Sequence, residues 1–72
     1  MRIINLDEFG IKLISSEKKQ VYLTKKEIKM LLSKQYEIKD HILCVDTKKL
    51  QLSDSDMQDF NKALDYIQAN FS

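Results

Sequence analysis

Lysine side chains gather in residues 18–34 and are the strongest chemical signal in this sequence. Six lysines share this segment with a single acid, Glu27. If residues 25–34 are helical, Lys26 and Lys29 lie on one outward face with Lys25 and Lys34 beside it. Such a face can follow the phosphates of a nucleic acid. No arginine, asparagine or glutamine interrupts residues 25–34 to recognise base edges, so any such binding would tolerate many sequences.

Two large side chains on outward faces suggest protein contacts instead. Met30 falls on the outward side of the lysine helix, and Tyr66 lies beside Lys62 on the outward side of a second, acidic helix, with Asp59 nearby. Methionine and tyrosine are enriched at protein interfaces. We therefore predict a partner-binding set made of both kinds of residue: Lys18, Lys19, Lys25, Lys26, Lys29, Met30, Lys62 and Tyr66.

Nucleophilic catalysis needs a nucleophile, a base and an orienting group. The sequence has one histidine, His41, and one cysteine, Cys44. If this segment is a strand, the two side chains point to opposite faces and cannot form a catalytic pair. Cys44 lies in an apolar run and is expected to be a small buried side chain. We predict no catalytic residues and no enzymatic activity.

Metal and cofactor sites are not indicated either. A structural zinc site takes four Cys or His ligands, and only two such residues are present. The acidic segment 54–56 resembles the start of a calcium loop but lacks the glycine and the terminal glutamate of one. Gly10 is the only glycine, so no glycine-rich loop can surround a phosphate. We expect no metal and no cofactor.

The size and composition describe a single small domain over residues 1–72. With 43% hydrophobic and 32% charged residues, the chain is too apolar for a disordered tail and too charged for a membrane span. Residues 1–49 carry eleven basic and seven acidic groups, and residues 50–72 carry one and four, so the halves have net charges of +4 and −3. No signal-peptide pattern is evident, and one cysteine excludes an internal disulfide. We expect a cytoplasmic protein without membrane contact.

The first half of the sequence predicts strands followed by a helix. Residues 2–15 fit either two strands, Arg2–Leu6 and Ile11–Ser15, or a helical spacing, and Gly10 favours the strands. Residues 11–14 and 20–23 around a polar turn predict a hairpin. Thr24 and Glu27 predict a capping box that begins a helix over 25–34.

The second half repeats this order. Residues 36–38 predict an edge strand, 42–45 a central strand, 46–49 a turn and 50–52 a returning strand. Ser53 and Asp56 predict a second capping box. The long helix that follows has an apolar stripe at helical spacing, made of Met57, Phe60, Leu64, Ile67 and Phe71.

These patterns predict an α+β fold, with a small, mostly antiparallel sheet of three to five short strands and two helices packed on one face. The approximate order is β-β-α-β-β-α. We expect a small non-enzymatic regulator that binds and modulates or inhibits a protein partner, in the manner of accessory proteins of phages and mobile elements. The alternatives are nucleic-acid binding through the lysines of residues 18–34 and a homodimer that covers an apolar face.

Overall fold

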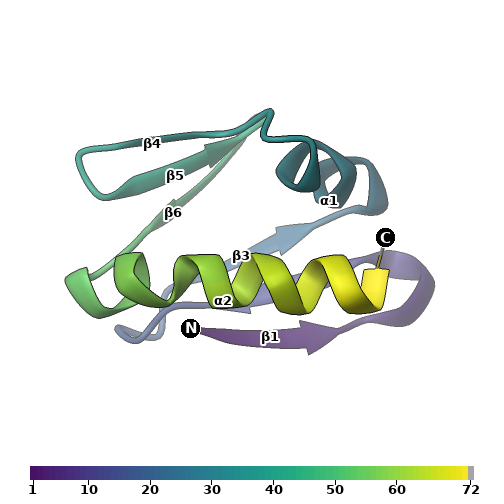
Figure 1. Ribbon diagram of the computed structural model, residues 1–72, viewed down its shortest axis with the longest axis horizontal. Helices are drawn as coiled ribbons and strands as arrows, with labels where there is room; N and C mark the ends of the chain where they lie inside the picture. Colours follow the sequence, from purple (N-terminus) through teal and green to yellow (C-terminus); the bar gives the residue numbers. More distant parts are fainter. Residues whose placement is uncertain (72) are drawn as a thin grey trace.

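The computed structural model, which describes residues 1–71, contains two three-stranded antiparallel sheets and two helices (Figure 1). The predicted α+β class is confirmed, and the strands form two sheets rather than one. A short 3-10 helix precedes the second strand. The elements are β1 (Arg2–Asn5), a 3-10 helix (Asp7–Phe9), β2 (Ile11–Ile14), β3 (Gln20–Leu23), α1 (Lys25–Leu32), β4 (Glu37–Lys39), β5 (Ile42–Val45), β6 (Lys48–Gln51) and α2 (Asp54–Phe71).

The first sheet has the order β1-β2-β3, so the strand interpretation of residues 2–15 is confirmed. Gly10 ends the 3-10 helix with a φ of +108°, a conformation that L side chains rarely adopt. A Cβ atom at this position would stand 2.0 Å from the carbonyl oxygen of Leu23. Glycine therefore allows β2 to begin directly against the end of β3.

The second sheet has the order β4-β5-β6, which confirms β5 as a central strand. Asp40 and His41 both have positive φ and form the two-residue turn between β4 and β5, as type I′ hairpins require. The next turn is also short, because Val45 pairs with Lys48. The predicted turn over 46–49 is therefore two residues too long, and β6 begins at Lys48 rather than at Leu50.

The core lies between the inner faces of both sheets and the two helices. Strands β3 and β6 contact each other, and so the two sheets meet there. Helix α1 contacts β3 of the first sheet, β5 of the second sheet and helix α2. The buried side chains form one cluster: Ile11, Leu13, Leu23, Ile28, Leu31, Leu43, Val45, Leu50, Leu52, Phe60 and Ile67.

Helix α1 begins as predicted and ends early. Thr24 and Glu27 form both bonds of the capping box, which confirms that prediction. At the other end, Lys34 has a φ of +60° and its N–H donates to the Leu31 carbonyl, while Gln35 N–H donates to the Met30 carbonyl. This pair of bonds is a Schellman motif and stops the helix at Leu32, two residues before the predicted end.

Helix α2 follows its predicted capping box, because Ser53 N–H donates to Asp56 and Asp56 N–H donates to the Ser53 hydroxyl. The predicted apolar stripe is wrong at its first position, where Met57 is exposed. The first turn instead buries Asp56, which is hydrogen-bonded and so can be enclosed. Ala63, outside the predicted stripe, is also buried because its small side chain faces the core.

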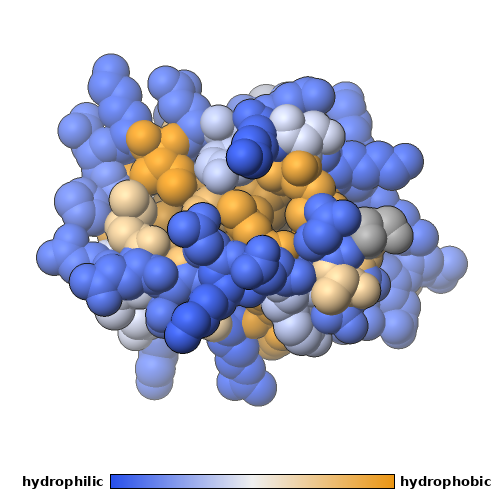
Figure 2. All heavy atoms as spheres, viewed as in Figure 1, coloured by the Kyte–Doolittle hydropathy of each residue, from blue (hydrophilic) through white to orange (hydrophobic). Residues whose placement is uncertain are grey.

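The α2 side of the surface is mostly hydrophilic, with hydrophobic side chains in a furrow above the helix (Figure 2). Leu31, Leu32 and Leu64 help to line an open cavity of about 280 Å³ between α1 and α2. Neither helix within residues 1–71 combines the length and the apolar character needed to cross a membrane.

Candidate functional site

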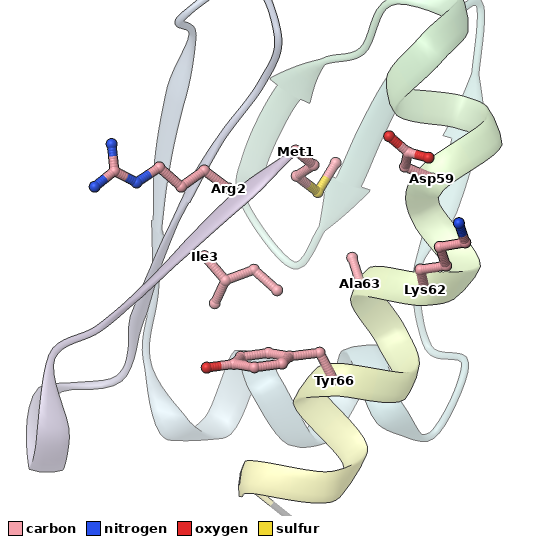
Figure 3. A pocket seen from close by; sticks show the side chains of 7 residues that line it. All are labelled: Met1, Arg2, Ile3, Asp59, Lys62, Ala63 and Tyr66. Atoms are coloured by element: carbon pink, nitrogen blue, oxygen red, sulfur yellow. The ribbon is translucent and has the colours of Figure 1, made fainter.

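An open groove of about 590 Å³ lies between strand β1 and helix α2. We call it the β1–α2 groove (Figure 3). Three of its residues come from the start of the chain and four from the middle of α2. They are Met1, Arg2, Ile3, Asp59, Lys62, Ala63 and Tyr66.

Helical spacing explains why these α2 residues share the groove. Phe60, Ala63 and Ile67 face the core, and the positions just beside that stripe are 59, 62 and 66. These positions are separated by three and four residues, so their side chains form one ridge along the helix. The ridge stands at the margin of the core, where β1 passes α2.

The groove combines an apolar floor with an aromatic wall. In Figure 3 the side chains of Met1, Ile3 and Ala63 lie between the two elements, and the Tyr66 ring reaches across toward β1. Tyr66 is 50% exposed, and Ala63 is 8% exposed. The ring centroids of Tyr66 and Phe71 are 6.4 Å apart, so the Phe71 ring, at the end of α2, packs beside the Tyr66 ring. A tyrosine with this exposure can still bury much of its ring against a ligand.

Three charged residues line the groove, two of them from α2 and one from β1. Arg2, Asp59 and Lys62 take part in none of the ion pairs found within residues 1–71. The Arg2 side chain points away from α2 in Figure 3, so its main chain is the part that lines the groove. Lys62 and Tyr66, which the sequence placed among the partner-binding residues, both line this groove.

The predicted lysine patch is divided by the fold. Lys25, Lys26 and Lys29 are exposed together on α1. Lys18 and Lys19 lie in the turn between β2 and β3, at the far end of β3 from α1. A four-residue strand is roughly 13 Å long, so these two lysines do not join the α1 group in one continuous surface.

Met30 and Cys44 differ from their predicted environments. Met30 is half-buried and packs against the core, so it is not a free outward side chain on α1. Cys44 is half-buried rather than fully buried, because in β5 the alternate residues Leu43 and Val45 take the core face. Cys44 thus lies on the outer face of the second sheet.

His41 interacts with an acid at the start of α2 rather than with the cysteine. Its Nε2 atom is 2.8 Å from Oδ1 of Asp54, and both side chains are largely exposed. Among residues 1–71, no three His, Cys, Asp or Glu side chains are grouped to hold a metal ion.

Asp56 is a buried carboxylate that connects three segments. It accepts hydrogen bonds from the backbone N–H and hydroxyl groups of Ser16 and Ser53, and the Met1 amino group is 3.5 Å from Oδ1. Burial raises the pKa of Asp56, but the hydrogen bonds from Ser53 and Ser16 outweigh burial and hold that pKa below its ordinary value. The contact between the Met1 amino group and Asp56 holds this groove residue beside the start of α2.

Glu27 and Lys48 form a second polar junction, at the start of α1. Lys48 Nζ is 3.4 Å from Oε1 of Glu27 and donates to the Tyr22 carbonyl at 2.7 Å. Burial raises the pKa of Glu27, and hydrogen bonds from Thr24 with the charge of Lys48 lower it by more. This junction ties α1, β3 and β6 together away from the groove.

Sequence reasoning missed Met1, Arg2, Ile3 and Ala63 as groove residues. The one signal that pointed to this surface was an outward tyrosine among polar residues on an amphipathic helix. Comparison of the chain with protein-family models, with curated proteins and with solved structures found no match.

Proposed function

We propose that this protein acts by binding another protein in the β1–α2 groove and thereby modulates or inhibits that partner. The open groove with its half-exposed Tyr66 carries the proposal. Tyrosine, methionine and arginine are enriched where proteins meet, whereas lysine is depleted there. This preference favours the groove, which exposes Tyr66, over the lysine surface of α1 as the protein contact.

The charges around the groove support selectivity for one partner. Lys62 carries positive charge there, and Asp59 carries negative charge. Because these two side chains have no ion-pair partners within residues 1–71, a ligand can pair with them without breaking an existing ion pair. We place the protein in the cytoplasm, where a reducing environment keeps the half-buried thiol of Cys44 free.

Affinity capture tests this proposal. The tagged protein and two variants, Tyr66→Ala and Met57→Ala, are incubated with nuclease-treated lysate of cells that express the protein. Met57 is exposed on the same helix but does not line the groove, so it is the matched control. We expect a protein that is captured by the parent and by Met57→Ala and lost with Tyr66→Ala. Equal capture by all three would refute the groove as the contact.

Nucleic-acid binding through α1 is the second candidate, because Lys25, Lys26 and Lys29 are exposed together. Three phosphate contacts predict that log K falls with log salt at a slope of about −3 on duplex DNA. A gel shift at low salt, with Lys26→Glu/Lys29→Glu as the comparison, measures this directly. No retardation of the parent protein would exclude this candidate.

A further inference from the structure

We infer that the occupant of the β1–α2 groove is an extended segment of the partner, which pairs with β1 as a fourth strand of the first sheet. The inference rests on the proposed function and specifies its chemistry. The segment alternates apolar side chains, which face α2, with acidic side chains, which face the opposite side of the sheet.

The first argument comes from the unpaired edge of β1. The Leu6 N–H donates to the Gly10 carbonyl on the β2 side at 2.9 Å. Backbone groups of alternate residues point to opposite sides of a strand, so Ile4 and Arg2 also face β2, and Ile3 and Asn5 face outward. Within residues 1–71, β1 pairs with no strand other than β2. The outward N–H and C=O groups are those that another strand can pair with.

The second argument comes from the position of this edge. Figure 3 shows β1 running alongside α2 with the groove between them. Arg2 lines the groove while its side chain points away, which means that the main chain of β1 is accessible there. A strand added at this edge directs alternate side chains toward Ala63 and Tyr66. In such strand addition, main-chain hydrogen bonds provide the affinity, and contacts of the alternate side chains provide the selectivity.

The third argument comes from the charge on the outer face of the first sheet. The pairing register places six side chains on this face, two of them basic and none acidic. They are Arg2, Ile4, Lys12, Ile14, Gln20 and Tyr22. A partner strand beside β1 places its outward side chains next to Arg2, while Lys12 lies one strand further on, in β2. An acidic residue opposite Arg2 forms a favourable cross-strand pair, and Lys12 adds to the positive charge of this face.

The same charges disfavour a second copy of this chain as the occupant. Pairing of β1 with β1 of another copy would put two Arg2 and two Lys12 side chains on one outer face without an acid between them. Like charges across strands are destabilising. The edge is also only four residues long, which suits a short peptide better than a stable dimer interface.

The experiment is a selection of random peptides displayed on phage against the tagged full-length protein, with the Tyr66→Ala variant as the counter-target. Tyr66 is half-exposed, so its removal opens the groove without disturbing the core, and alanine favours a helix. We expect enriched peptides in which apolar and acidic residues alternate. The synthetic form of the most enriched peptide should bind the parent at least about tenfold more tightly than Tyr66→Ala, and a Met57→Ala control should bind like the parent.

Amide exchange then tests the pairing itself. On binding, the Ile3 amide should exchange at least about tenfold more slowly, while the Ile4 amide, already bonded to β2, should change little. Enriched peptides without alternation, equal binding to Tyr66→Ala, an unchanged Ile3 amide or formation of a dimer would each overturn the inference. A natural partner that is lost with Tyr66→Ala but leaves the Ile3 amide unchanged refutes strand pairing and leaves the proposed function standing.

Discussion

Replacing Asp56 with asparagine keeps the shape of a buried side chain and removes its charge. The carboxylate is 0% exposed and accepts hydrogen bonds from Ser16 and Ser53. In the variant, an amide group at the Oδ1 position meets the Met1 amino group, and one at the Oδ2 position meets the Ser53 N–H, and both of these are donors. The Ser16 N–H reaches both positions and keeps an acceptor in either case. One donor, at Met1 or at Ser53, therefore loses its acceptor inside the protein.

The expected loss of stability is large for a chain of this size. Hydrogen bonds to a charged group contribute about 1.5–3 kcal/mol each, and a buried group left without a partner costs about 1–3 kcal/mol. Allowing for the bonds that asparagine keeps, we expect a loss of about 3 kcal/mol. A 72-residue domain has roughly 4–11 kcal/mol in total. Asp56→Asn should thus lose a substantial part of the free energy of unfolding.

The loss should depend on pH in a fixed direction. Because the folded pKa of Asp56 is lowered from its ordinary value of 3.8, the carboxylate stabilises the fold fully above that value. This stabilisation disappears as the pH falls through the folded pKa. The parent and the variant should therefore differ most near neutral pH and converge in acid, below about pH 4.

Urea unfolding followed by circular dichroism measures both effects. With an m value near 1 kcal/mol/M, a loss of about 3 kcal/mol moves the midpoint by about 3 M at pH 7. Ser16→Ala is the comparison, because it removes one hydroxyl and leaves the backbone N–H in place. A midpoint for Asp56→Asn within about 0.5 M of the parent at pH 7, or a difference that persists unchanged at pH 2, would refute this account of Asp56.

Three further changes have expected outcomes. Gly10→Ala should destabilise the fold by at least about 2 kcal/mol in urea unfolding, because φ is positive and the new Cβ meets the Leu23 carbonyl; an unchanged midpoint would contradict this. Lys48→Met should raise the pKa of Glu27 in an NMR titration, since burial then acts without the lysine charge; an unchanged or lower pKa would contradict it. Tyr66→Ala should change stability by less than about 1 kcal/mol while abolishing partner capture, and a variant that binds normally would count against the groove.

Local signals in the sequence determined where the two helices begin. The capping bonds join Thr24 to Glu27 and Ser53 to Asp56. Each pair is three residues apart, so its bonds depend only on the local geometry of a helix start. The continuous apolar run over residues 42–45 likewise predicted a central strand, and β5 is central in the second sheet. The end of α1 could not be predicted in the same way. It depends on a left-handed conformation of Lys34, which is uncommon for residues other than glycine.

Assembly of the candidate site was decided by contacts between distant segments. Ser16 and Asp56 are 40 residues apart and meet inside the protein, and Ile3 meets α2 only because β1 lies beside it. The extended strand β3 also separates Lys18 from the α1 lysines, which are near it in sequence. Periodicity and capping operate within about one helical turn or a strand pair. The groove depends on how complete elements pack against one another, and so it became visible only in the tertiary structure.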